Sequence, residues 1–71
     1  MDAEPTLQEI LEDIRTKPTV PLWPHVGTVL GISRGSTYAA ARRGDFELLE
    51  VGRLKRAISA PLRKRLGLNG G

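Results

Sequence analysis

Apolar residues near the start of the chain recur at the spacing of an α-helix. They fall at i, i+3, i+4 and i+7 and so share one face over two turns: Leu7, Ile10, Leu11 and Ile14. Thr6 and Glu9 match a capping box, in which two side chains satisfy free backbone amides at a helix start. The pattern predicts an acidic amphipathic helix over residues 6–16, preceded by a flexible N-terminus of residues 1–5.

The apolar stripe of this helix allows two interpretations. It packs on the core of its own chain, or it also contacts a second copy or another protein, because so small a core offers little surface. In the second interpretation all four stripe residues belong to an oligomer or partner contact: Leu7, Ile10, Leu11 and Ile14.

Three prolines interrupt the next segment and exclude a helix until its end. Residues 17–23 are predicted to form an extended proline-rich connector, anchored by Val20, Leu22 and Trp23. For Trp23, packing in the core is the preferred interpretation, and stacking on a nucleic-acid base is the alternative.

Two short helices joined by a sharp turn are predicted in the middle of the chain. The first covers residues 25–30, with His25 on the surface near its start. Gly27 must be small, because the second helix is expected to cross the first there. Three residues of this helix are expected to turn inward: Val26, Val29 and Leu30.

The second helix has a start signal and a stop signal. Gly31 suits the positive φ of the turn, and Ser33 is placed to cap the helix over residues 34–43. Gly44 follows as a C-terminal stop, with two arginines in the last turn, where the helix dipole favours cations. Two helices with a glycine-containing turn of this length form a helix-turn-helix pattern.

The pattern then changes to that of a β-hairpin. Two runs that carry apolar residues, 47–51 and 54–58, flank a tip near Gly52. Glu50 is expected to pair across the hairpin with a basic residue. A continuous helix over this segment is the alternative, but Gly52 would interrupt it.

A short basic helix is predicted to complete the fold. Ser59 is expected to cap it, residues 62–66 to form it and Gly67 to end it. Residues 69–71 are expected to form a disordered tail. Three basic residues of this helix are expected to be exposed: Arg63, Lys64 and Arg65.

The composition excludes several kinds of site and of cellular location. A chain of 71 residues limits the fold to one domain, and the absence of cysteine excludes disulfides and thiolate metal sites. A single histidine excludes a multi-histidine metal cluster. With neither a membrane-spanning apolar run nor a signal peptide, we expect a small soluble protein of the cytoplasm, associated with the nucleoid.

Charge is divided unevenly along the chain. Residues 1–13 hold five acidic and no basic side chains, whereas residues 14–71 hold all 11 Lys and Arg against three acidic residues. The net charge of +3 therefore hides a basic body behind an acidic leader. A basic body of this kind favours a polyanionic partner.

The chemistry points to binding rather than catalysis. No nucleophile–base pair, metal set or phosphate-binding loop is visible, so we expect no enzyme activity, no cofactor, no metal and no small-molecule substrate. A basic helix-turn-helix suits double-stranded DNA, with Arg34 as the best guanine contact and Ala40 among the outward positions. The candidate DNA contacts are Ser33, Arg34, Ser36, Thr37, Tyr38, Arg42, Arg43, Arg53, Lys55 and Arg56.

Several of these residues also carry a resemblance. Leu-Gly-Ile-Ser-Arg-Gly-Ser-Thr-Tyr at 30–38, Arg-Arg-Gly-Asp-Phe at 42–46 and Val-Gly-Arg at 51–53 resemble the excisionase-type branch of the MerR-like winged helix-turn-helix domains. The resemblance implies a mostly α fold with a small β-hairpin, a winged helix-turn-helix domain over residues 24–68, and the amphipathic helix as an extra element before it. It places Arg53 in the wing.

Small members of that branch are typically recombination directionality factors that bind and bend attachment-site DNA and help an integrase to excise a mobile element. The resemblance thus implies an architectural DNA-binding protein that acts as a dimer or a cooperative array, with an integrase as a further partner and no membrane. A small transcription regulator of the same fold is the alternative. A protein-interaction module that uses the N-terminal apolar stripe is the second alternative.

Overall fold

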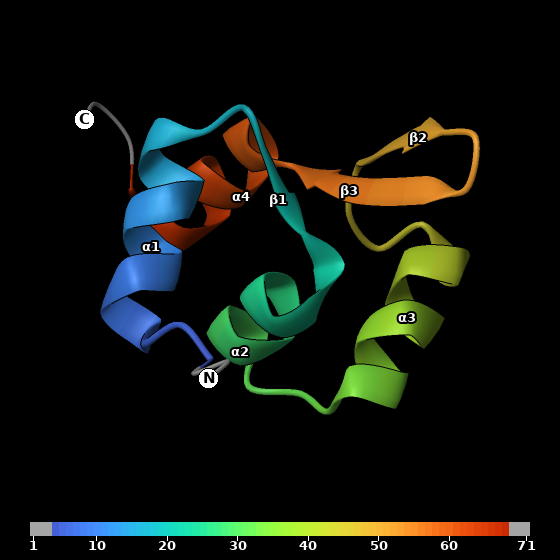
Figure 1. Ribbon diagram of the computed structural model, residues 1–71, viewed down its shortest axis with the longest axis horizontal. Coiled ribbons are helices and arrows are strands. Elements are labelled where there is room, and N and C mark those ends of the chain that lie inside the picture. Colours follow the sequence, from blue (N-terminus) through green and yellow to red (C-terminus); the bar gives the residue numbers. More distant parts are fainter. Residues whose placement is uncertain (1–3, 69–71) are drawn as a thin grey trace.

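The computed structural model of the protein describes residues 4–68. Within them, four α-helices and a three-stranded antiparallel sheet form a small, mostly helical domain (Figure 1). The predicted tail and the first three residues of the predicted flexible N-terminus lie outside this range. The elements in chain order are α1 (Leu7–Thr16), β1 (Thr19–Pro21), the kinked turn η1 (Leu22–Val26), α2 (Gly27–Leu30), α3 (Arg34–Arg43), β2 (Leu48–Val51), β3 (Leu54–Ile58) and α4 (Ser59–Leu66).

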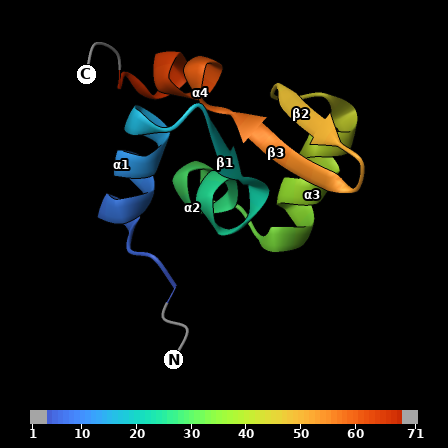
Figure 2. The same cartoon turned by 45° about the horizontal axis from the view of Figure 1, so that its top comes forward.

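Helix α1 begins with the predicted capping box. The Thr6 amide donates to Glu9 Oε1 at 2.7 Å, and the Glu9 amide donates to Thr6 Oγ1 at 3.1 Å. The helix packs along α4, as the rotated view also shows (Figure 2). Its stripe is divided, because Ile10 and Ile14 are buried in the core whereas Leu7 is 53% exposed.

The proline-rich connector contains a strand that the sequence analysis did not predict. Residues 19–21 pair antiparallel with β3, and the strand order is β1-β3-β2. Val20 lies opposite Ala57, and neither has any exposed surface. The predicted hairpin thus supplies two strands of a three-stranded sheet, in which the central strand β3 pairs with β2 along one edge and with β1 along the other.

The expectation that His25 lies on the surface is wrong. Its side chain is buried, and its Nε2 lies 2.8 Å from Asp13 Oδ2. This hydrogen bond, and secondarily Lys17 at 3.3 Å, hold the pKa of Asp13 below its ordinary value of 3.8. The contact connects α1 to η1 across twelve positions of sequence, which local patterning does not reveal.

Gly27 confirms the expectation of a close helix crossing. A Cβ atom at this position would overlap the Trp23 ring and lie 2.5 Å from Thr37 Oγ1 on α3. Trp23 is half-buried and covers the glycine, which agrees with the interpretation that it packs rather than stacks on a base. The backbone at position 27 is therefore where η1, α2 and α3 meet.

Two other expectations are corrected by burial. Leu30 is 44% exposed rather than turned inward, because α2 ends immediately after it. Ser59 does not cap α4; it is the first helical residue, and its buried hydroxyl lacks a hydrogen-bond partner among the described residues. The core is formed by Ile10, Ile14, Val20, Leu22, Val26, Ala41, Ala57 and Leu62.

We predict that Gly27→Ala lowers the free energy of unfolding by about 1–3 kcal/mol, because a methyl group forces the Trp23 ring and α3 away from α2. Urea denaturation followed by circular dichroism measures the change. The matched control is Gly35→Ala, which adds the same methyl group in open space and should leave stability unchanged or raise it by about 0.5–1 kcal/mol. Equal effects of the two substitutions would contradict the proposed crowding.

We predict that stability falls as the pH drops through the lowered pKa of Asp13. A carboxyl group whose pKa is lower in the folded state stabilises the fold above its unfolded value of 3.8 and loses that contribution in more acidic solution. Urea denaturation across the acid range should show that Asp13→Asn loses less of its free energy of unfolding on acidification than the unmodified protein does. The control Glu12→Gln removes an exposed carboxylate that pairs with Arg15 and should leave the acid-range loss in place.

Candidate nucleic-acid interface

The turn between α2 and α3 has the backbone that the sequence predicted. Gly31 has a φ of 72°, and its amide donates to the carbonyl of Thr28 at 3.2 Å. Ser33 Oγ accepts from the amide of Ser36 at 3.1 Å and so caps α3. At the other end Gly44 has a φ of 82°, so the predicted bounds of this helix are confirmed.

Helix α3 turns one face inward, and this corrects part of the candidate site. Thr37 is fully buried, and its hydroxyl donates to the carbonyl of Ser33 at 2.8 Å. The prediction that Thr37 contacts DNA from the outer face of the helix is therefore wrong. Ala40 was also expected to point outward, but it is 5% exposed. Both lie on the side that packs against the body, at the i, i+3 spacing of one helix face.

The outer face of α3 carries exposed polar and basic side chains. Arg34 and Ser36 lie in the first turn, and Arg42 and Arg43 lie in the last. Arg43 forms an ion pair with Asp45 at 2.6 Å, and both partners are exposed. An exposed ion pair of this kind contributes only about 0–1 kcal/mol of free energy, so it restrains Arg43 weakly.

The predicted β-hairpin is confirmed, and the helical alternative for this segment is wrong. Gly52 has a φ of 59° in the turn, and the register places Glu50 opposite Lys55 and Val51 opposite Leu54. All four side chains are exposed. Val51 and Leu54 are not among the residues predicted to form the site, although their positions on either side of the turn pair them.

Arg56 has a structural role rather than a free guanidinium. Its Nε donates to Thr19 Oγ1 at 2.9 Å, and its NH2 donates to the Thr19 carbonyl at 3.3 Å. It therefore fastens β3 to β1, and it is only half exposed. Among the predicted basic contacts on the hairpin, Arg53 and Lys55 remain exposed.

A cleft of about 380 Å³ separates α3 from the hairpin. Apolar side chains lie in it, and polar groups reach into it from both elements. Tyr38 and Arg42 come from the helix, and Glu50 and Lys55 come from the hairpin. Tyr38 is half-buried and packs against the core. The full lining is Leu22, Tyr38, Ala41, Arg42, Leu48, Glu50 and Lys55.

The basic side chains of α4 are not equally free. Arg63 is half-buried and donates to the carbonyl of Ile14 at 3.0 Å, so the expectation that it is exposed is wrong. Arg65 donates to the carbonyl of Asp45 at 3.4 Å. Lys64 is exposed. Gly67 ends the helix with a φ of 73°, as predicted.

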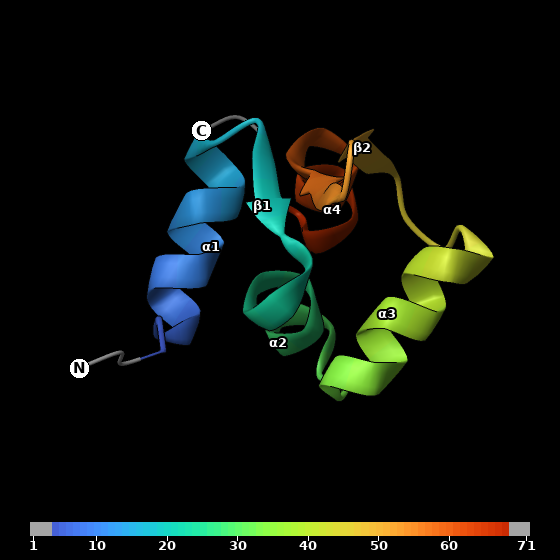
Figure 3. The same cartoon turned by 45° about the vertical axis from the view of Figure 1, so that its right-hand side comes forward.

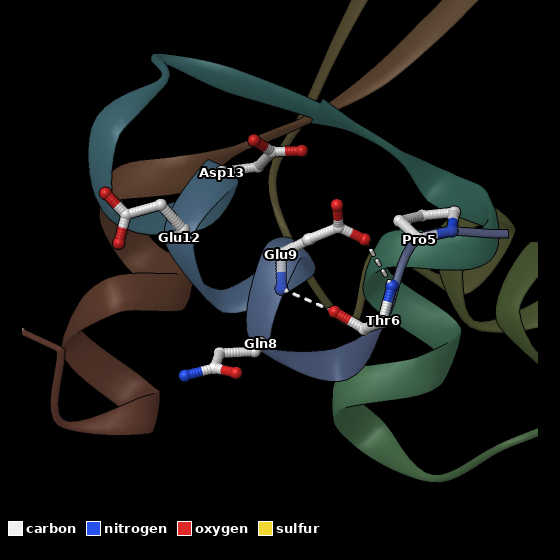
Figure 4. Close-up of a pocket in the computed structure, with 6 residues that line it drawn as sticks. All are labelled: Pro5, Thr6, Gln8, Glu9, Glu12 and Asp13. Atoms are coloured by element: carbon white, nitrogen blue, oxygen red, sulfur yellow. Dashed lines mark hydrogen bonds between the residues drawn. The ribbon is translucent and has the colours of Figure 1, made fainter.

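Helix α1, which carries Glu9, Glu12 and Asp13, lies at the opposite side of the molecule from α3 (Figures 1 and 3). A shallow hollow of about 480 Å³ there is lined by Pro5, Thr6, Gln8, Glu9, Glu12 and Asp13 (Figure 4). Glu9 is bonded within the capping box, and Asp13 is bonded to His25. Among residues 4–68, no group of three or more acidic, histidine or cysteine side chains is placed to hold a metal ion.

No protein-family model, curated protein or solved structure matches this chain. Within the described range, the helices are too short and too polar for any of them to cross a membrane. Function is therefore inferred from the geometry and charge of the described residues.

We predict that Arg56→Met lowers the free energy of unfolding by about 1–2 kcal/mol, because it removes two hydrogen bonds from a charged donor to Thr19. The neighbouring control Lys55→Met removes the same charge from an exposed side chain and should change stability by less than about 0.5 kcal/mol. Thermal unfolding of the two variants measures the difference. If both lose stability equally, Arg56 has no special role in fastening β3.

Proposed function

We propose that the protein binds double-stranded DNA as a winged helix-turn-helix, with α3 in the major groove and the β2–β3 hairpin as the wing. The observation that carries the proposal is the placement of exposed basic groups. Arg34, Arg42, Arg53 and Lys55 come from α3 and the hairpin, on the side of the molecule away from α1 (Figure 1). Within residues 34–56, six basic residues stand against three acidic ones. A phosphate backbone is attracted to such a surface.

Residues of α3 and the hairpin would contribute different contacts in this arrangement. Arg34, in the first turn of α3, reaches a base edge, and a bidentate contact to guanine is its best match. Ser33 and Ser36 lie at the same helix start, where backbone amides favour a phosphate. Tyr38 and Arg42, together with Lys55, contact a phosphate at the cleft between helix and hairpin.

The proposal extends to an architectural role. A single module of this size buries only about 600–1,000 Å² on DNA, so several copies on adjacent sites are needed for tight binding. With the sequence resemblance, this supports a recombination directionality factor that bends attachment-site DNA for an integrase. A small transcription regulator would use the same contacts and would differ only in what the bound DNA controls.

The alternative of a pure interaction module is less well supported. Two of the four residues of the apolar stripe, Ile10 and Ile14, are buried in the core of their own chain. Leu7 and half-buried Leu11 alone remain for a partner. Binding through the whole stripe would require α1 to leave the core.

We predict salt-dependent binding to a random DNA duplex, measured by fluorescence anisotropy at several salt concentrations. The logarithm of the binding constant should fall linearly with the logarithm of the salt concentration, because each phosphate contact releases counterions. Arg42→Ala and Lys55→Ala should each reduce the slope by about 0.9. On a selected site, Arg34→Ala should also reduce discrimination between sequences by about 1–3 kcal/mol.

The matched control is Lys64→Ala, which removes one exposed positive charge from α4, outside the proposed interface. It should leave the slope of the unmodified protein almost unchanged. Absence of binding at low salt would refute the proposal. If DNA binds, excision assays with a cognate integrase and reporter-transcription assays distinguish a recombination directionality factor from a transcription regulator.

A further inference from the structure

A small cleft of about 180 Å³ lies where the end of α3 meets α4 and the turn between α2 and α3. Its walls are apolar, and they are formed by Leu30, Ile32, Ala40, Phe46, Leu62 and Leu66. The other three lining residues, Arg43, Asp45 and Arg65, are exposed and form its rim. The cleft thus combines an apolar interior with a charged entrance, which is typical of a site for a small ligand.

Leu30 is the residue of this cleft that folding leaves least covered. It is 44% exposed, whereas Ala40 and Leu62 beside it in the cleft are only 5% and 3% exposed. Single exposed leucines are ordinary, but this one borders a cleft whose deeper walls are already shielded from water. A ligand that covered Leu30 would remove apolar surface from water, which favours binding.

The size of the cleft limits the ligand. An apolar cavity of about 150 Å³ lined by leucine, isoleucine and phenylalanine is large enough for benzene. The present cleft is similar in volume and in lining, so it suits one aromatic ring or an aliphatic chain of about six carbons. It is smaller than the sites of about 300–1,000 Å³ that hold drug-sized molecules.

The charge at the rim favours an anionic group on the ligand. Arg43 Nη2 donates to the Asp45 carboxylate at 2.6 Å, which leaves the second arginine in excess. Arg65 Nη1 donates to the main-chain carbonyl of Asp45 at 3.4 Å, and no carboxylate among the described residues pairs with it. A guanidinium carries five N–H donors, so Arg65 can also bind a ligand carboxylate.

We propose that this cleft binds a small carboxylate that carries one apolar group, of which benzoate and hexanoate are simple examples. The ring or chain contacts Leu30 and Phe46, and the carboxylate accepts hydrogen bonds from Arg65. The site lies apart from the cleft between α3 and the hairpin, and ligand binding to it does not depend on the proposed function.

The experiment is a nuclear magnetic resonance titration of the full chain with sodium benzoate, without DNA. The methyl signals of Leu30, Ile32 and Leu66 should shift and saturate together. Benzyl alcohol has the ring without the charge, and acetate has the charge without the ring. Each should bind at least about tenfold more weakly than benzoate, because each lacks one of the two interactions.

Two substitutions test the two parts of the site separately. Arg65→Met should raise the dissociation constant of benzoate about tenfold and leave that of benzyl alcohol unchanged. Its matched control, Lys64→Met, removes a neighbouring exposed cation that does not line the cleft. Leu30→Gln should weaken both ligands, whereas Leu7→Gln, an exposed leucine on α1, should weaken neither. All four residues are exposed, and thermal unfolding checks that each variant is folded.

Four results would overturn the proposal. The first is a lack of shifts at the cleft up to the solubility limit of benzoate. The second is equal binding of benzoate by Arg65→Met and Lys64→Met. The third is binding of N-acetylphenylalaninamide as tight as that of benzoate, which would indicate the side chain of a partner protein as the occupant. The fourth is a shift of the cleft signals with protein concentration alone, which would indicate a second copy. None of these results would affect the DNA-binding proposal, which the anisotropy titration tests separately.

Discussion

The contact between Gly27, Trp23 and Thr37 sets the geometry on which the remaining surface depends. With no side chain at position 27, the Trp23 ring and the Thr37 hydroxyl both lie close to the backbone of α2. Thr37 in turn donates to the carbonyl of Ser33, which binds the start of α3 to the same point. The angle between α2 and α3 is thereby fixed by steric contact, and with it the direction in which the exposed arginines of α3 point.

The separation of acidic from basic side chains is the second organising feature of the molecule. The acidic helix is held to the body by its buried isoleucines and by the Asp13–His25 hydrogen bond, whereas most of the basic groups lie on the opposite elements. Such a charge distribution orients the protein before contact, because a polyanion attracts one side and repels the other. The carboxylates of α1 therefore contribute to orientation toward any polyanion even without touching it.

The sequence predicted the elements that depend on local signals. The capping box at Thr6, the positive-φ glycines at 31 and 44 and the hairpin turn at Gly52 all depend on nearby residues, and all are confirmed. The errors concern residues whose surroundings are set by distant parts of the chain. Examples are His25 with Asp13, Arg56 with Thr19, and the strand β1. Thr37 was misplaced because a polar residue on a basic helix does not reveal which face packs inward.

The third strand of the sheet stops before the hairpin does. Strand β1 pairs with β3 only from Ile58 to Arg56, and it ends at Pro21, which has no amide hydrogen to continue the ladder. Beyond Arg56, the last residues of the hairpin are supported by β2 alone. Stiffness therefore decreases from base to tip, so the end of the hairpin can bend while its base stays aligned with the rest of the sheet.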